Sequence, residues 1–184
     1  MMEYTIFGES HGPAVGVLIQ NIPAGLPVDG ELIHADLLRR KASGALATGR
    51  HEPDEVELLA GVYQGRTTGD ALVAVLRNRD VRSGDYAALR DIPRPGHADY
   101  AAFVRSGGCN DYRGGGRFSG RLTAPLTVAG ALAITYLKTA HIAVHADVLD
   151  EEALRARAAA AKADGDSVGG VIRCTVSGLP AGLG

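Results

Sequence analysis

Two histidines lie in glycine-rich segments of the kind that bring a titratable side chain close to a ligand. His11 stands in residues 8–12 (GESHG), and His97 stands in residues 94–100 (RPGHADY). Glycine lets the backbone approach a ligand closely, and histidine changes charge near neutral pH. The two segments therefore predict proton transfer, with His11 and His97 as the catalytic candidates. Either histidine could instead be structural, His97 as an exposed side chain beside a helix capped by Asp99.

A third glycine cluster, residues 114–116, is flanked by arginines. Arg113, Arg117 and Arg121 surround it, and a helix is predicted to begin near Ser119. Backbone N–H groups and the positive end of a helix dipole favour a phosphate, and arginine binds phosphate and carboxylate oxygens through two parallel hydrogen bonds. The cluster therefore predicts an anion site, although runs of glycine also occur in flexible linkers.

Three further arginines stand around a segment rich in glycine, alanine and threonine. Arg39 and Arg40 precede residues 41–49, Arg50 follows them, and the composition predicts a mobile loop. The ordinary interpretation is that these arginines are solvated surface residues. If they act together on an anion, each charged hydrogen bond contributes roughly 1.5–3 kcal/mol, enough to hold a substrate with several anionic groups.

An internal repeat bears on the role of His11. At one offset of 157 residues, residues 8–12 (GESHG) align with 165–169 (GDSVG), and residues 23–26 with 180–183 (both PAGL). Val168 stands at the position equivalent to His11, so the glycines and the serine suffice to form the turn. We therefore expect His11 to serve chemistry rather than the fold.

Residues 8–12 also match the Gly-x-Ser-x-Gly pattern of hydrolases, which makes acyl transfer by Ser10 an alternative. That pattern needs a strand before the serine and a helix after it. Here only a short stub is predicted before Ser10, while Pro13 and a β-branched run follow. The repeat also retains the pattern around Ser167, and two nucleophiles in one hydrolase would be unusual. Proton transfer by His11 is the preferred interpretation.

The hydrophobic pattern mixes strands and helices without a regular β-α-β rhythm. Extended or alternating runs predict strands over residues 14–22, 55–63, 70–76, 141–149 and 171–179, the second and third forming a hairpin. Composition predicts helices over residues 30–40, 99–105, 119–138 and 151–162. This order favours a layered α+β fold over a dinucleotide-binding fold, organised as one domain over residues 1–184.

Composition excludes several classes of function. Hydrophobic residues make up 46% of the 184 residues, enough for a buried core. A formal charge of −2 argues against a nucleic-acid or anionic-membrane surface. Cys109 and Cys174 form neither a metal quartet nor a disulfide framework, and no metal site is predicted. The lack of a signal-peptide pattern, and the Pro125 interruption of the apolar run 122–137, predict a cytoplasmic protein without a membrane segment.

Taken in order along the chain, these segments resemble chorismate synthase. The blocks that carry the resemblance are residues 8–12 (GESHG), 23–27 (PAGLP), 39–40 (RR), 50–55 (RHEPDE), 65–69 (GRTTG), 94–100 (RPGHADY) and 111–117 (DYRGGGR). The fold implied is a sandwich of helices between antiparallel sheets, with internally duplicated β-α-β units. The activity implied is 1,4-elimination of phosphate from 5-enolpyruvylshikimate 3-phosphate to give chorismate, in aromatic amino-acid biosynthesis. Reduced FMN is required although the reaction has no net redox change.

The resemblance also implies roles for individual residues. His11 would help the phosphate leave as an acid, and His97 would donate or relay a proton at the reduced flavin. FMN would contact Arg40, Arg117, Phe118 and Ser119, and the substrate would contact Ser10, Arg39, Arg50 and Arg121. The sequence departs from the family at Phe118, Gly120 and Leu122, and in a 41–49 loop that is one residue shorter and lacks an arginine. The first three departures indicate a subfamily, and the altered loop predicts a lower affinity for substrate or pyridine nucleotide.

The resemblance further implies a homotetramer that binds a small anionic substrate, with no nucleic-acid or membrane partner. The source of flavin reduction stays open, with NADPH as one candidate. Chorismate synthases continue well beyond a segment such as residues 178–184, and the second repeat lacks the helix that follows the first. We therefore expect a truncated chain that lacks part of its active site. The alternative to an enzyme is a non-catalytic fragment that retains only fold or assembly contacts.

Overall fold

The computed structural model describes residues 1–41, 50–81, 84, 86–87 and 90–182, in two compact units. The first unit comprises Met1–Arg40 and Arg50–Leu132, and the second comprises Lys41–Gly49 and Ala133–Gly184. Apart from its first residue, the predicted mobile loop 41–49 lies outside the described residues. The single domain predicted over residues 1–184 stays a prediction.

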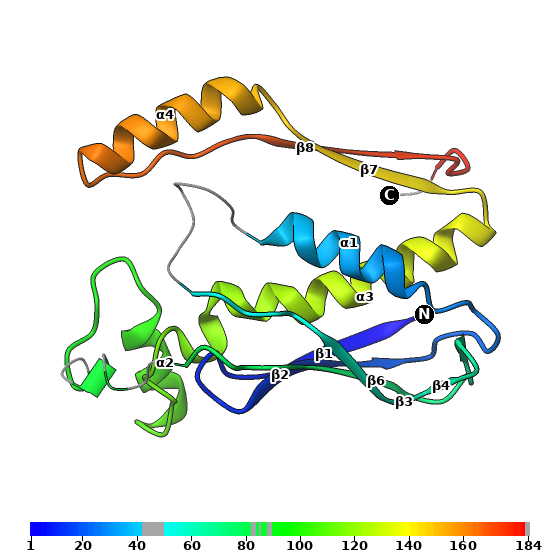
Figure 1. Ribbon diagram of the computed structural model, residues 1–184, viewed down its shortest axis with the longest axis horizontal. Coiled ribbons are helices and arrows are strands. Elements are labelled where there is room, and N and C mark those ends of the chain that lie inside the picture. Colours follow the sequence, from blue (N-terminus) through cyan, green and yellow to red (C-terminus); the bar gives the residue numbers. More distant parts are fainter. Residues whose placement is uncertain (42–49, 82–83, 85, 88–89, 183–184) are drawn as a thin grey trace. The chain divides into compact units, whose positions relative to one another are not determined.

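A four-stranded antiparallel sheet in the order β1-β2-β6-β3 forms the base of the first unit (Figure 1). Its strands are β1 (Glu3–Gly8), β2 (Ala14–Gln20), β3 (Val56–Ala60) and β6 (Leu72–Arg77). Between β3 and β6, a separate short hairpin consists of β4 (Val62–Tyr63) and β5 (Arg66–Thr67). The pairing of β3 with β6 confirms the predicted hairpin, with a register shift between Leu58 and Ala60.

One face of this sheet forms the core because apolar residues alternate along its central strands. Val15, Val17 and Ile19 of β2 are fully buried. They cluster with apolar side chains of α1 (Gly30–Arg40) and of the first part of α3 (Thr123–Thr139), which lie on one side of the sheet (Figure 1). A slip of one residue would turn the buried set toward solvent, so burial specifies the register and with it the positions of the connecting turns.

The second unit contains the antiparallel pair β7 (Ala143–Val148) and β8 (Ile172–Ser177), with helix α4 (Glu151–Ala163) between them in sequence. At the offset of the internal repeat, β8 corresponds to β2. Left-handed backbone recurs at equivalent turn positions, as in Gly25 and Gly182. The repeat ends upstream, because β1 is a strand whereas most of the equivalent residues 160–165 belong to α4. Helices and antiparallel sheets together confirm the α+β class.

Three predictions of local structure were wrong. The segment before Ser10 is the six-residue strand β1, which pairs with β2 along its whole length, rather than a stub. The long helix begins at Thr123 rather than near Ser119, because two short 3₁₀ helices, η3 (Gly116–Phe118) and η4 (Gly120–Leu122), occupy the glycine-rich approach. Asp99 does not cap α2 (Asp99–Ser106), since its carboxylate bonds back to Arg94.

Candidate active site

His11 lies in the turn that connects β1 to β2. Gly8 leads into this turn with a φ of 92°, and a side chain there would collide with the backbone of Ala14. The N–H of Ser10 donates to the carbonyl of Gly116 at 3.1 Å. The Ser10 hydroxyl is buried and lies 3.1 Å from Nδ1 of His11. The glycine therefore shapes the turn, and the serine contacts the imidazole ring.

The glycine cluster lies directly against His11. Gly114 has a φ of 60°, and a Cβ added to it would overlap the His11 ring and approach the Ser10 hydroxyl. The ring of Tyr86 also meets the His11 ring edge to face, with the ring centroids 4.9 Å apart. Only glycine at residue 114 leaves room for the imidazole in this position, so the cluster does more than link two elements.

Asn78, which follows β6, holds the backbone of the His11 turn. Its Nδ2 donates to the carbonyls of Glu9 at 3.0 Å and Gly12 at 2.8 Å, on either side of the serine and the histidine. Its Oδ1 accepts from Nε of Arg121 at 3.0 Å. A single amide thus connects a buried arginine to both ends of the turn, which restricts the positions that the imidazole can adopt.

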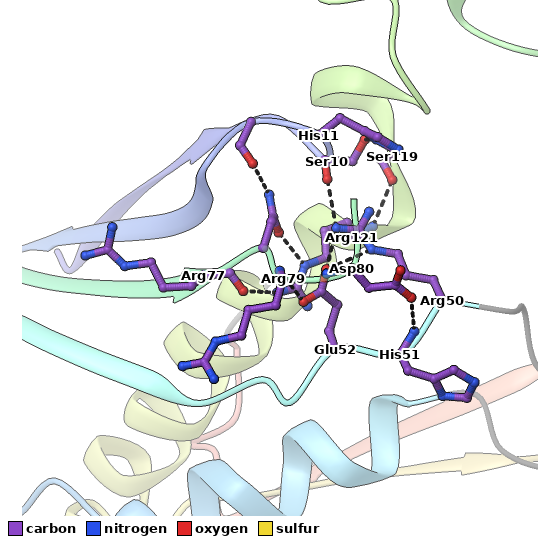
Figure 2. A network of polar contacts seen from close by, with 12 residues as sticks. Ser10, His11, Arg50, His51, Glu52, Arg77, Arg79, Asp80, Ser119 and Arg121 are labelled. Atoms are coloured by element: carbon purple, nitrogen blue, oxygen red, sulfur yellow. Dashed lines mark hydrogen bonds and ion pairs between the residues drawn. The ribbon is translucent and has the colours of Figure 1, made fainter. Parts of the chain in front are cut away.

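Arg50 holds the same turn at its centre (Figure 2). Its Nη2 donates to the carbonyl of Ser10 at 2.8 Å and to Oε1 of Glu52 at 2.7 Å. The other oxygen of Glu52 accepts from the N–H of Arg79 at 2.8 Å. The Arg50 side chain is 23% exposed, so part of it faces solvent beside the turn. Arg50 is therefore both a support of the turn and a cation next to His11.

A buried carboxylate, Asp54, binds two of the predicted ligand-binding arginines. Its Oδ1 accepts from Nη1 of Arg121, and its Oδ2 accepts from Nη2 of Arg40 at 2.9 Å. The Asp54 and Arg121 side chains are 2% and 4% exposed. Burial by itself raises the pKa of Asp54, but hydrogen bonds and charges from Arg121 and Arg40 outweigh it and hold the pKa below its ordinary value. Arg121 thus supports the site from the interior.

His97 lies on a second turn, immediately before α2. Its Nδ1 is 2.6 Å from Oδ1 of Asp99. Arg94 holds the same carboxylate through its backbone N–H at 3.0 Å, its Nε at 2.8 Å and its Nη2 at 2.9 Å. These hydrogen bonds hold the pKa of Asp99 well below its usual range. The carboxylate is therefore ionised at neutral pH where it meets the His97 ring.

Arg94 also connects the two histidine turns. Its Nη2 donates to the carbonyl of Gly114, and its guanidinium lies 5.7 Å from the centroid of the Tyr86 ring. Gly114 and Tyr86 both lie against the His11 ring. The two predicted catalytic histidines, distant in sequence, therefore belong to one local arrangement.

An open pocket of about 280 Å³ lies beside His97. Its lining includes Arg105, Arg117 and Phe118, the last with an exposed ring, together with the Asp99 carboxylate. Arginine suits an anionic group and an aromatic ring suits a planar apolar group. The lining also contains the acidic residues Glu9, Asp99 and Asp111, of which the last two pair with Arg94 and Arg113. Arg105, Arg117 and Phe118 are the lining residues that fit a ligand with a phosphate and a flat ring system.

Other predicted site residues lie at different places in the first unit. Arg39 is 76% exposed on α1 and pairs with Asp36 at 3.1 Å. The hydroxyl of Ser119 accepts from the N–H of Arg121 at 3.2 Å, and so caps a 3₁₀ helix. Arg117 is exposed, and its Nη1 donates to a β1 carbonyl at 3.4 Å.

Sequence reasoning missed Asn78, Tyr86, Arg94 and Asp54 as parts of this arrangement. The polar residues that directly follow β6 could have indicated Asn78, because side chains at the end of a strand lie at the edge of the sheet. Among the described residues, no group of acidic, histidine and cysteine side chains could hold a metal ion. No helix in the described ranges is long and apolar enough to span a bilayer.

Comparisons with known proteins agree on one family. The family model described as chorismate synthase matches residues 2–151. Chorismate synthases from Thermococcus kodakarensis and Chitinophaga pinensis are 40% and 46% identical to the chain, and the alignments cover all of it but only 59% and 56% of those relatives. A crystal structure of a chorismate synthase has a similar fold, with a TM-score of 0.72 at 22% identity over 97% of this chain and 58% of that one. The chain spans little more than half the length of these relatives.

Proposed function

The chain belongs to the chorismate synthase family, and we propose that it forms the N-terminal part of an active site that converts 5-enolpyruvylshikimate 3-phosphate to chorismate and phosphate. One observation carries this proposal: the turns of His11 and His97 share Gly114 and Tyr86 as neighbours. A 1,4-elimination releases an anion and a ring proton, so it needs two separate proton-handling groups next to positive charge. The two turns and their arginines supply that combination.

His11 is proposed as the acid that assists departure of the phosphate. The Ser10 hydroxyl, 3.1 Å from Nδ1, orients the ring. Asn78 and Arg50 hold the carbonyls of the turn, so the ring is positioned before substrate binds. A proton delivered to a phosphate oxygen lowers the charge on the leaving group, and this is the step that a protonated imidazole can assist.

The substrate is proposed to be held by arginines, while Ser10, whose side chain is buried against His11, is proposed to act on it through the His11 ring. Arg50 lies against the His11 turn, and Arg39 has an exposed guanidinium on α1. A substrate with two carboxylates and one phosphate requires several cations, which neutralise it better when they form paired hydrogen bonds. Arg121 is proposed to act on the substrate through the turn that it supports, because its side chain is buried against Asp54.

Reduced FMN is proposed as the cofactor, with contacts from Arg40, Arg117, Phe118 and Ser119. The pocket beside His97 supports two of these contacts, since Arg117 and the exposed ring of Phe118 line it, whereas Arg40 and Ser119 are not among its lining residues. When bound, the reduced flavin would supply electron density transiently to the reacting ring. His97 would hold or relay a proton at the edge of this pocket. NADPH as reductant, a homotetrameric assembly and a cytoplasmic location are proposed with the family assignment.

The decisive experiment measures chorismate and phosphate release under anaerobic conditions. Both products should form only when reduced FMN and 5-enolpyruvylshikimate 3-phosphate are present together, and not with oxidised FMN. The assay is run on the 184-residue chain and on the protein extended to the length of its relatives. Turnover with oxidised flavin, or an esterase activity that Ser10→Ala abolishes while no lyase activity is found, would overturn the proposal in favour of the hydrolase.

A second candidate rests on the coverage of the relatives. Because the chain corresponds to 56–59% of two of them, it is also a candidate non-catalytic chain that keeps fold or assembly contacts. Chorismate formation by the extended protein but not by the 184-residue chain would favour this second function for the chain by itself.

A further inference from the structure

We infer that Asp99 is a positioning residue that holds the neutral ring of His97 in its Nδ1–H tautomer. Oδ1 of Asp99 lies 2.6 Å from Nδ1 of His97, which is a hydrogen-bonding distance. An ionised carboxylate can only accept a hydrogen bond, so Nδ1 must carry the proton. The choice between the two neutral forms of an imidazole is set by such a contact at one of its nitrogens.

Arg94 makes the carboxylate of Asp99 a rigid acceptor. Oδ2 accepts from the backbone N–H and the Nε of Arg94, and Oδ1 accepts from its Nη2. Two χ angles of Asp99 are therefore restrained by three hydrogen bonds from one residue. The same bonds keep the pKa of Asp99 below its usual range, so the group remains an acceptor across the pH range in which histidine titrates.

A competing contact at the same nitrogen does not reverse this assignment. Nη2 of Arg94 lies 3.3 Å from Nδ1 of His97, and a donation from it would require an unprotonated Nδ1. That arrangement would place a ring lone pair 2.6 Å from a carboxylate oxygen, which is repulsive. The shorter contact is therefore the hydrogen bond, and Arg94 acts on His97 through Asp99.

The consequence is that Nε2 is the nitrogen of neutral His97 that accepts a proton. His97 lines the pocket proposed for the flavin, so the fixed tautomer gives the ring one defined proton-exchanging atom at this pocket. This consequence rests on the proposed function, whereas the tautomer itself is a property of the chain that needs neither substrate nor turnover.

Nitrogen NMR of the 184-residue chain labelled with ¹⁵N-histidine tests the inference directly. At a pH where His97 is neutral, the wild-type chain should show a protonated Nδ1 and an unprotonated Nε2. In Asp99→Asn, the amide oxygen should take the place of Oδ2, because two donors of Arg94 meet that atom and only one meets Oδ1. Nη2 of Arg94 then loses its acceptor, and the amide N–H₂ faces Nδ1 of His97. The tautomer should then change to Nε2–H. A wild-type Nε2–H form, or an Nδ1–H form retained in a folded Asp99→Asn chain, would overturn the inference.

A matched control lies on the β7–β8 pair, where Nε2 of His145 is 2.7 Å from Oδ1 of Asp147. Asp147→Asn removes a similar histidine–carboxylate contact and should leave the His97 signals unchanged. If it changes them, the effect of Asp99→Asn is not local and the inference fails. If Asp99→Asn does not fold, the wild-type spectrum still decides. A chain with the expected tautomers but no lyase activity in any form would contradict the proposed function alone.

Discussion

Gly114 and the His11 ring depend on each other for space. The glycine has a left-handed backbone and no side chain, and the imidazole occupies the volume that a Cβ would need. The ring also has a serine hydroxyl at 3.1 Å and an aromatic edge at one face. The position of the His11 ring therefore depends on Gly114, which leaves room for it, and on the Ser10 hydroxyl, which orients it.

Replacing His11 with valine tests whether the ring serves chemistry or the fold. The predicted recurrence of this turn around Val168 was wrong, because residues 166–170 form no turn. The His11 turn is instead held through its backbone by Asn78 and Arg50, so we expect His11→Val to fold and to keep its melting temperature. Chorismate formation should fall on the order of 10²- to 10⁴-fold, because proton transfer is lost. Circular dichroism measures the melting temperature. Initial rates of the protein extended to the length of its relatives measure chorismate formation.

His34→Gln, at an exposed position of α1, is the control and should change neither the melting temperature nor the rate. An unfolded His11→Val chain, or an unchanged rate, would show that the role of the histidine was misassigned.

At the level of elements, one buried carboxylate joins three segments. Asp54 stands before β3, Arg40 ends α1, and Arg121 precedes α3. Arg121 then reaches the His11 turn through Asn78. A buried ion pair that loses one partner leaves an uncompensated charge. We therefore expect a substitution of Asp54 to destabilise the contacts among these three segments.

Asp54→Asn should destabilise the first unit by about 3–5 kcal/mol at neutral pH. The pKa of Asp54 is lowered in the folded state, so its contribution is fully present above the pKa of an unfolded aspartate, about 3.9, and is lost as pH falls through the lower folded pKa. The difference between wild type and Asp54→Asn should therefore shrink below about pH 4. Urea unfolding at neutral and acidic pH measures both effects.

The control for this prediction is an ion pair at the surface. Glu57 and Arg77 pair at 2.9 Å with side chains that are 40% and 50% exposed. Glu57→Gln should change the free energy of unfolding far less than Asp54→Asn, because solvent screens an exposed pair. An equal loss in the free energy of unfolding in the two variants would contradict the assignment of Asp54 as a buried carboxylate that connects three segments.

For the molecule as a whole, the prediction concerns how fully the described residues enclose the proposed flavin pocket. The pocket beside His97 is open, and its described lining comes from Glu9, from residues 97–111 and from the glycine-rich segment 115–118. A cofactor of this size is ordinarily enclosed over most of its surface. We expect the 184-residue chain to bind FMN at least about tenfold more weakly than the full-length Chitinophaga pinensis relative. Fluorescence titration of FMN against both proteins measures this. Equal affinities would show that this chain alone supplies the contacts that matter.

The sequence by itself determined the elements and the family. An extended β-branched run that ends at a Pro-Ala-Gly turn identified β2, and composition identified α1 and α4 nearly to their ends. These signals are local, because periodicity and propensity act within a few residues of the backbone. The order of the short motifs led to the chorismate synthase family, which the comparisons then showed. The strand β1 was missed because its pairing with β2 defines it, and the late start of α3 was missed because two 3₁₀ helices occupy the glycine-rich residues before it.

Only the tertiary structure decided which residues surround the two histidines. Asn78 meets the carbonyl of Gly12 across 66 positions, and Arg121 meets Asp54 across 67. Strand periodicity predicts the face to which a side chain points, but sheet order decides which segment it meets. A hydrogen bond from a side chain to a main-chain carbonyl cannot be predicted from the residue type of the acceptor, since every residue carries a carbonyl. The support of His11 and His97 therefore became visible only once β2 and β6 were paired and the glycine cluster lay against the His11 turn.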